Sequence, residues 1–545
     1  MYKKHHDLIN FETFFIISIY IIIIYIILFP KIEMLSSSTA RETSINNQEY
    51  NSFKSWRYVI LYPTNYMKFK STLAFFTLTF ISLLFFLIFS SNHYSTSLFS
   101  RYDVVPGNFT TSGDKDEETN ISHILFGIGG SAKTWNDRRH YSKLWWKSNV
   151  TRGFVWLDKE PPQPETTSSE SSFMPYRVSA NTSEFKYTCS YGSRSAVRMA
   201  RILKESFELG LDNVRWFVMG DDDTVFFTEN LVVVLGKYDH NEMYYVGGNS
   251  ESVEQNVIHS YSMAYGGGGF AVSYPLAVEL VRVLDSCINR YHNFFGSDQK
   301  VQGCLSEMGV PLTKELGFHQ LDIRGHSYGL LAAHPVAPLV SLHHINYLEP
   351  LFPNQTRIDS LKRLVSAYEM DPGRTLQQAV CYDLKRKWSI SVSWGYTVQL
   401  YPSLVTAKEL STAWLTFKTW RSWSLGPFTF NTRLFSQNPC ENPIFYFMDG
   451  AEITGSGRTL TSYKKQRLIT SDANDCGRGD YAAALAIQSF NVSATHFNPE
   501  LWSNKAPRRH CCEITYDQGD AEGVAGSTAQ ILIRGCNHYE SVTPY

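Results

Sequence analysis

The stretch with the clearest chemical potential is WFVMGDDDTVFF, residues 216–227, in which three aspartates separate two apolar runs. Adjacent carboxylates repel one another, and the apolar flanks favour a buried segment over an exposed, aspartate-rich turn. Because side chains alternate in extended chain, we expect Asp221 and Asp223 to point to one side and Asp222 to the other. Two convergent carboxylates suit Mg²⁺ or Mn²⁺, whose remaining positions water and a diphosphate would fill. The stretch therefore predicts a metal site for a nucleotide substrate.

Two further stretches carry suitable residues but also have ordinary structural explanations. YGGGGFAVSYPLA, residues 265–277, has four consecutive glycines before a helix-like run. Glycine lets the backbone approach a ligand closely, although a flexible loop gives the same pattern. FFGSDQKVQGCLSEMG, residues 294–309, predicts a helix with Ser297 as its N-cap. Asp298 in the first turn complements the helix dipole, and the pattern alone favours that structural role.

A third stretch, PLVSLHHINYLEP at residues 338–350, predicts a strand that ends in His343 and His344. Two histidines at a strand end could bind a metal ion or a phosphate. A pair of histidines is more often structural, so the residues alone do not assign a role to either one.

The elements that must position these residues alternate along the chain. Apolar runs predict strands at 123–130, 153–158 and 215–220, and helical patterns occupy 133–148 and 195–210. This order implies a parallel sheet with crossover helices. Such sheets bind ligands beyond the carboxyl ends of their strands, which is where the three aspartates lie.

Composition narrows the class of function. The 545 residues are enough for two or three domains, and a net charge of -1 gives no electrostatic case for nucleic acid as a partner. An aromatic content of 14% argues against wholesale disorder. A metal-dependent nuclease built on the aspartates therefore fits poorly.

Two apolar stretches near the N-terminus predict a membrane anchor. Residues 73–89 carry no charge and approach the roughly 20 residues that a spanning helix needs. Because Lys68 and Lys70 precede them, the positive-inside rule puts the N-terminal side in the cytosol and the bulk of the chain in a lumen. The expected organisation is an N-terminal segment 1–71, whose apolar stretch 14–29 either spans as well or is signal-like, then an anchor at 72–90 and a lumenal stalk at 91–119.

All six Asn-x-Ser/Thr sequons and all nine cysteines follow the expected anchor. This distribution fits an oxidising lumen with glycosylation and some disulfides. The odd number of cysteines leaves at least one thiol unpaired or bonded between chains. The sequons begin at Asn108, Asn120, Asn149, Asn181, Asn354 and Asn491.

The composition changes after about residue 355. WSISVSWGYTVQLYP, residues 388–402, predicts strand, and six of the nine cysteines lie beyond residue 380. We therefore expect a separate β-rich, cysteine-containing extension at 356–545, and no chemistry is assigned to it.

Four blocks of the sequence, in order, resemble the plant family of Fringe-related glycosyltransferases. The blocks are RWFVMGDDDTVFFTENLVVVLGKYDH, YGGGGFAVSYPLA, FFGSDQKVQGCLSEMGVPLTKELGFHQLDIRG and LLAAHPVAPLVSLHHI. The resemblance runs from about residue 120 to about residue 355, and the C-terminal tail also resembles the extension of that family. Four ordered blocks are specific, whereas a lone Asp-x-Asp would not be.

The resemblance implies an α/β catalytic domain at 120–355 with the GT-A fold, a Rossmann-like α/β/α sandwich. It implies transfer of a sugar from a UDP-sugar to an acceptor hydroxyl of a glycan or glycoprotein, with inversion and a β-1,3 linkage, and a need for Mn²⁺ (or Mg²⁺). It also implies a single-pass type II protein of the Golgi membrane with its catalytic domain in the lumen.

By position, the resemblance also assigns roles to residues. The implied set is Asp298 as catalytic base, Asp223 with His343 or His344 as metal ligands, and Asp221, Asp222, Gly268 and Gly269 as donor-binding residues. A carboxylate at the base position would take the proton from the acceptor hydroxyl, and the metal would act on the departing diphosphate as a Lewis acid.

Two departures from true Fringe enzymes concern the membrane topology and the acceptor, and not the donor site. They are the extra apolar stretch at 14–29 and the long C-terminal tail. An alternative is a catalytically inactive lumenal sugar-binding or scaffolding protein with a GT-A shell, which the tail and the 12 tryptophans favour. The presence of Asp223, Asp298 and a candidate metal-binding histidine favours the enzyme.

Overall fold

The computed structural model describes residues 117–162, 173–466, 479–503, 509–516 and 527–543, together with Thr79. Residues 112–545 make up one compact unit, distinct from residues 1–111. The anchor predicted at 72–90, apart from Thr79, and the apolar stretch at 14–29 lie outside the described residues. Among the described residues, no helix is both long enough and apolar enough to cross a membrane.

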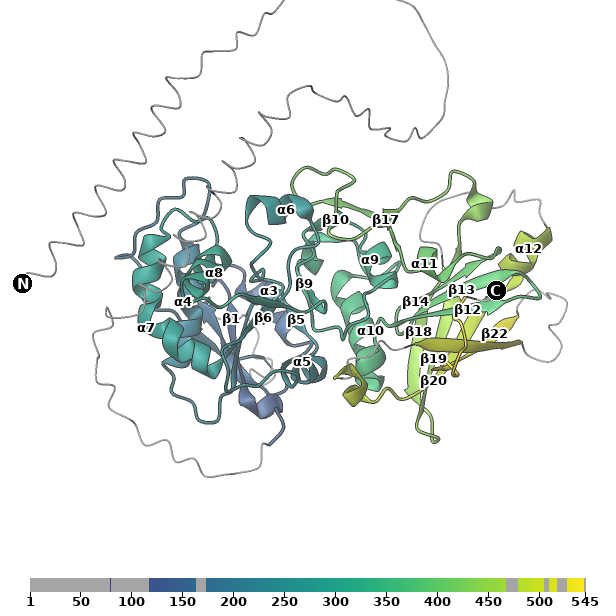
Figure 1. Ribbon diagram of the computed structural model, residues 1–545, viewed down its shortest axis with the longest axis horizontal. Coiled ribbons are helices and arrows are strands. Elements are labelled where there is room, and N and C mark those ends of the chain that lie inside the picture. The colour runs from purple at the N-terminus through teal and green to yellow at the C-terminus, as the bar shows by residue number, and fades with distance from the viewer. Residues whose placement is uncertain are drawn as a thin grey trace, which may run out of the picture. The chain divides into compact units, whose positions relative to one another are not determined.

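A seven-stranded sheet forms the centre of the first half of the 112–545 unit, in the order β3–β2–β1–β4–β7–β6–β8 (Figure 1). Its strands are β1 (Ile124–Gly129), β2 (Arg152–Leu157), β3 (Tyr176–Val178), β4 (Trp216–Asp221), β6 (Tyr245–Gly247), β7 (Phe270–Ser273) and β8 (Leu312–Lys314). The three strands predicted from the sequence are β1, β2 and β4, and β1 pairs in parallel with both of the others. The prediction of parallel strands is correct for these three.

The sheet as a whole is mixed, because β7 runs antiparallel to both β4 and β6. Met219 of β4 pairs with Phe270 of β7, so the glycine run before β7 lies beside the carboxyl end of β4. The helix-like run predicted directly after the glycines begins as a strand instead, because Phe270–Ser273 completes the sheet before the next helix starts.

Helices α4 (Ser195–Phe207), α7 (Tyr274–Arg290) and α8 (Ser297–Glu307) pack against one another over one face of this sheet (Figure 1). Their apolar residues recur at helical spacing and form one buried cluster with the strands beneath. A disulfide between Cys287 and Cys304 joins α7 to α8. The sheet and this disulfide therefore fix the start of α8.

The start of α8 differs from the prediction by one residue. Ser297 is the first residue of the helix, and Gly296 holds the N-cap position. The reason is that the side-chain oxygen of Gln299 accepts the N–H of Phe295 at 3.1 Å and that of Gly296 at 3.3 Å. The N–H of Gln299, which an N-cap side chain would otherwise accept, donates instead to the Asp298 carboxylate at 3.0 Å.

The opposite face of the sheet carries α3 (Trp135–Ser142), α5 (Thr228–Leu235) and a small sheet of β5 (Val225–Phe226), β11 (Ser341–Leu342) and β9 (Phe318–His319). Helix α3 is shorter than the predicted 133–148. Trp145 lies beyond its end, packs on Phe126 and Phe226, and donates its indole N–H to the carbonyl of Thr224 at 3.1 Å. These contacts of Trp145 explain why α3 ends at Ser142.

An eight-stranded sheet forms the second half, in the order β12–β13–β14–β18–β19–β20–β22–β21. Its strands are β12 (Gln378–Asp383), β13 (Trp388–Ser393), β14 (Thr397–Tyr401), β18 (Ile444–Ile453), β19 (Arg458–Lys465), β20 (Ser489–Thr495), β21 (His510–Tyr516) and β22 (Thr528–Gly535). Disulfides join Cys381 to Cys512 and Cys511 to Cys536. Among the described cysteines, Cys189 is free and buried, as the odd number requires.

One apolar core connects the two sheets through α9 (Tyr328–Ala332) and α10 (Arg357–Met370). The fully buried hydroxyl of Tyr328 lies 3.1 Å from that of Thr397, and Tyr396 donates to the carbonyl of Leu351 at 3.1 Å. The second half therefore shares its core with the first. The remaining elements are η1 (Ile121–His123), α6 (Val253–Ile258), β10 (Ile323–Gly325), η3 (Ile345–Tyr347), η4 (Pro372–Arg374), α11 (Ala407–Leu410), β15 (Ala413–Trp414), β16 (Phe417–Thr419), β17 (Thr432–Arg433), η5 (Pro439–Glu441), α12 (Gly479–Ala486) and η7 (Pro499–Trp502).

Candidate active site

The aspartate run lies at the carboxyl end of β4, in a tight turn. Asp221 ends the strand, and its N–H donates to the side-chain oxygen of Thr224 at 2.9 Å. The same hydroxyl donates to the carbonyl of Gly267 at 2.7 Å. Thr224 therefore fixes the turn and ties it to the glycine run.

Asp221, Asp223 and His343 converge, and their ligand atoms all lie within 4.8 Å of one another. The Nε2 atom of His343 lies 3.2 Å from Asp223 and 3.7 Å from Asp221. Both carboxylate oxygens of Asp223 are buried and have no hydrogen bond of good geometry among the described residues. Two carboxylates and an imidazole suit a divalent metal, and such a cation would satisfy the buried oxygens of Asp223.

Electrostatics separate the ligands of this triad. Although 34% of the Asp221 side chain is exposed, the protein packed around it raises its pKa to about 7. Burial alone would raise the pKa of Asp223, but His343 and Arg138 outweigh it and hold that pKa below the usual range. Burial alone would lower the pKa of His343, but Asp223 and Asp221 raise it to about 9. Without a metal ion, the imidazolium supplies the positive charge that the carboxylates require.

Asp222 points away from the triad, as expected. Its carboxylate accepts from Arg138 of α3 at 2.7 Å, and Arg138 also lies 3.4 Å from Asp223. The N–H of Asp222 donates to the carbonyl of Gly129 at the end of β1 at 2.9 Å. Sequence reasoning missed Arg138, because an arginine in a polar helix gives no signal of a buried partner.

Asp298 lies in the first turn of α8 and faces the glycine run. Its carboxylate accepts the N–H of Gly266 at 3.3 Å and that of Gln299 at 3.0 Å. Burial raises the pKa of Asp298, and these two backbone donors oppose the rise. Asp298 and Asp221 line the same small cavity, of about 30 Å³. The expected base and Asp221, which was expected to bind the donor, therefore face a common space.

The glycines of the run differ in what they contact. A Cβ atom on Gly267 would lie 2.1 Å from the imidazole of His343, so only glycine fits beside that ring. Gly268 donates its N–H to the side chain of Gln320 at 2.6 Å, and its carbonyl accepts from Ser341. Gly269 has a φ of 86° and packs against Phe226. Gly268 and Gly269 thus hold the run in place, and their donor-binding role stays a prediction.

The structure brings His343, and not His344, to the aspartates. His344 has a left-handed backbone with φ 56°, which turns its ring away, and its Nδ1 lies 3.1 Å from Asp322. Its ring stacks on Trp420 with a centroid distance of 4.4 Å and an interplanar angle of 3°. His343 is therefore the candidate metal ligand of the pair.

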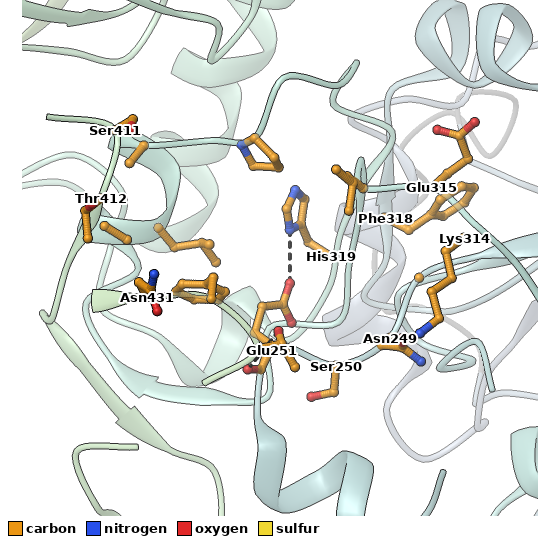
Figure 2. Close-up of a pocket in the computed structure, with 18 of the residues that line it drawn as sticks. Asn249, Ser250, Glu251, Lys314, Glu315, Phe318, His319, Ser411, Thr412 and Asn431 are labelled. Atoms are coloured by element: carbon orange, nitrogen blue, oxygen red, sulfur yellow. Dashed lines mark hydrogen bonds and ion pairs between the residues drawn. The ribbon is translucent and has the colours of Figure 1, made fainter. Parts of the chain in front are cut away.

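A larger cavity, of about 590 Å³, lies apart from this centre. Figure 2 shows Glu251 and His319 facing each other in it, with the His319 Nδ1 atom 3.0 Å from the carboxylate. The other ring nitrogen of His319 lies 2.9 Å from the Nε2 atom of His334. None of the aspartates described above lines this cavity within the described part of the chain. Its buried groups pair with one another, whereas the Asp223 oxygens have no hydrogen bond of good geometry among the described residues, so the aspartates are the candidate site.

Comparisons with known proteins match this chain to two family models. A family model described as Fringe-like matches residues 119–375, and one described as a protein of unknown function, DUF604, matches residues 255–512. Among solved structures, a glycosyltransferase involved in the glycosylation of the major capsid of PBCV-1 is 11% identical, and the match covers 44% of this chain and 97% of that chain with a TM-score of 0.23. A search of curated proteins found no match. The TM-score is too low to support the fold, which rests on the strand order.

Proposed function

This chain belongs to the Fringe-related family of glycosyltransferases, and we propose that it transfers a sugar from a UDP-sugar to an acceptor hydroxyl with inversion, in a reaction that needs a divalent metal. The observation that carries the proposal is the buried Asp223 carboxylate, which converges with Asp221 and His343 and whose two oxygens have no hydrogen bond of good geometry among the described residues. Such a group calls for a cation.

The chemistry divides between the metal triad and Asp298, which lines the small cavity together with Asp221. Asp223, Asp221 and His343 would hold Mn²⁺ or Mg²⁺, which when bound neutralises the charge of the departing diphosphate. Asp298 accepts the proton of the acceptor hydroxyl. The acceptor oxygen forms its bond to the anomeric carbon while the bond from that carbon to the diphosphate breaks, and UDP leaves with the electron pair. The backbone N–H of Gly266 holds the Asp298 carboxylate toward the cavity.

Three finer features complete the proposal. The linkage is β-1,3 on a glycan or glycoprotein, and the protein is a single-pass type II protein of the Golgi membrane with its catalytic domain in the lumen. The apolar run at 73–89 after Lys68 and Lys70, together with sequons that all follow it, supports this topology. The disulfides within residues 287–536 fit an oxidising compartment.

The proposal is tested by UDP release from full-length protein with UDP-galactose, UDP-glucose, UDP-N-acetylglucosamine and UDP-xylose. With Mn²⁺ present, at least one donor should release UDP, and chelation should stop the release. Asp223→Ala should lose the metal-dependent activity, whereas Asp239→Ala in an exposed loop should keep it. A folded protein with no metal-dependent UDP release from any donor would favour the inactive sugar-binding alternative.

A further inference from the structure

The loop 420–427 comes from the second half of the chain, yet it is attached at both ends to the first half. Before it, β16 pairs antiparallel with β10, and Gly325 lies opposite Phe417. After it, Phe428 forms a bridge with Ser252, and Thr429 donates its N–H to the carbonyl of Glu251 at 3.0 Å. The loop is therefore held across the catalytic half by backbone contacts.

One side of this loop contacts His344, which lies beside the candidate metal ligand His343. The ring of Trp420 stacks on that of His344, whose centroid lies 3.8 Å from that of His343. The guanidinium of Arg324 lies 3.6 Å from the ring centre of Trp420, and its Nε donates to the carbonyl of Trp420 at 3.3 Å. Trp420 is thus already engaged by protein groups and fixes the loop beside the metal site.

The next residue of the loop extends toward the side of the catalytic base. The N–H of Arg421 donates to Glu254 at 3.1 Å. Its guanidinium lies 5.7 Å from the ring centre of Phe295, which precedes Asp298 by three residues. The loop therefore lies between His344, the neighbour of the candidate metal ligand His343, and the segment that carries the expected base.

Beside Trp420, Trp423 of the loop and Tyr347 of η3 present aromatic surface that is partly exposed. Trp423 is 59% exposed and Tyr347 is 45% exposed. Their ring centres lie 5.5 Å and 5.2 Å from the guanidinium of Arg324. Exposed large aromatics gathered around a held cation mark a binding surface rather than a packed core.

The chemistry of this surface suits a pyranose. One face of a pyranose presents C–H bonds, which are weakly positive and meet the negative face of an aromatic ring, while the hydroxyl groups around the rim stay in water. The loop lies beyond the Fringe-like match at 119–375 and inside the DUF604 match at 255–512. The Fringe-like match therefore contains the metal triad and Asp298 but not this loop.

We propose that the 420–427 loop forms the acceptor side of the active site, and that Trp423 together with Tyr347 is the surface on which a sugar ring of the acceptor glycan stacks. This inference rests on the proposed glycosyltransferase function, because it assigns the surface to the acceptor of that reaction.

The test measures binding of the methyl β-glycosides of galactose, glucose, N-acetylglucosamine and xylose to full-length protein, in Mn²⁺ and UDP, by saturation-transfer NMR. At least one glycoside should bind to the wild type. Trp423→Ala should weaken that binding by roughly tenfold, the loss expected for one aromatic stacking contact. Tyr347→Ala should weaken it in the same direction. Tyr539→Ala, which alters another aromatic that is 93% exposed in the same half, should leave it unchanged.

Three results would overturn the inference. The first is undiminished glycoside binding by Trp423→Ala, and the second is no binding of any of these glycosides to the wild type. The third is a Trp423→Ala variant that loses UDP binding and keeps glycoside binding, which would mean that Trp423 stacks on the uracil. The UDP-release assay separates this failure from failure of the proposed function. Metal-dependent UDP release with an unaffected Trp423→Ala refutes only the acceptor surface. Glycoside binding that depends on Trp423, without UDP release, refutes only catalysis.

Discussion

The two carboxylates assigned to metal and base have pKa values displaced in opposite directions. Asp223 is held in its ionised form by His343 and Arg138, despite its burial. Asp298 faces no cation at hydrogen-bonding distance among the described residues, so burial raises its pKa and two backbone N–H groups only partly oppose the rise. Two acids whose environments shift their pKa values in opposite directions are expected when one binds a cation and the other exchanges a proton.

Asp298→Asn tests the role of this residue as a base. The amide keeps an oxygen for the N–H of Gly266 but cannot take a proton, so kcat should fall by about 10²–10⁴ while UDP still stabilises the protein in a thermal-shift assay. The base works only as the carboxylate, so wild-type activity should fall as the pH drops through a pKa above the ordinary 3.8. The variant should lack this acidic limb. Wild-type kcat in the variant would exclude Asp298 as the base.

At the scale of elements, the glycine run contacts both the expected base, Asp298, and the candidate metal ligand, His343. It turns the chain into β7, and because β7 is antiparallel to β4, the run comes back beside the aspartates. Gly266 then contacts the expected base, and Gly267 lies against the candidate metal-binding histidine. A longer or bulkier connection would separate these two groups.

Gly267→Ala should therefore disrupt the metal site. The new methyl group would lie 2.1 Å from the buried His343 ring, which cannot yield without leaving Asp223. We expect a loss of stability of about 1–3 kcal/mol, typical of overpacking, and a higher Mn²⁺ concentration for half-maximal UDP release.

Gly266→Ala is the matched control, because the atom nearest its new methyl group would be 3.8 Å away. It should keep the wild-type Mn²⁺ requirement. If Gly267→Ala also kept it, the assignment of His343 as a ligand would be wrong.

The sequence predicts the elements whose signal is local. Strands β1, β2 and β4 are apolar runs, and α4 is an amphipathic repeat closed by Gly210, so neighbouring residues alone indicate them. Asp221 and Asp223 converge as expected, but a turn closed by Thr224 brings them together and not the alternation of an extended strand.

The rest of the site depends on contacts between distant elements, and no local pattern encodes these. The choice of His343 over His344 depends on a left-handed turn that a histidine rarely adopts. Gly266 reaches Asp298 because β7 runs antiparallel to β4. The loop carrying Trp420 is held at the site by the pairing of β10 with β16. The resemblance supplied Asp298 and the histidines, which the pattern alone left as structural residues.

At the scale of the whole molecule, the lumenal topology has a direct test. Asn149, Asn181 and Asn354 are exposed, whereas Asn491 lies within β20 and pairs with strands on both sides. Full-length protein made in secretory cells should therefore carry glycans on the three exposed asparagines, and N-glycosidase should lower its mass. Replacing all three by Gln should remove most of that shift. Unglycosylated wild-type protein from such cells would contradict a lumenal position for this half.

A second question at this scale is whether the first half of the compact unit can fold without the C-terminal half. The Fringe-like match ends at residue 375, which suggests that 112–375 could stand alone. The core argues otherwise, because Tyr328 and Phe352 are fully buried in one cluster with Trp394 and Tyr396 of the second half.

Ending the chain at residue 375 should therefore prevent cooperative folding. Each large apolar side chain uncovered costs about 1.5–3 kcal/mol, and several together exceed the roughly 5–15 kcal/mol by which a domain is stable. Circular dichroism should show no cooperative thermal transition for 112–375, whereas 112–545, which keeps the whole compact unit, should melt cooperatively. A soluble 112–375 fragment that melts near the temperature of 112–545 would show that the second half is dispensable for the fold. The acceptor surface at 420–427 would then be an addition to an independent enzyme, whereas a shared core makes it part of the same folding unit as the metal triad.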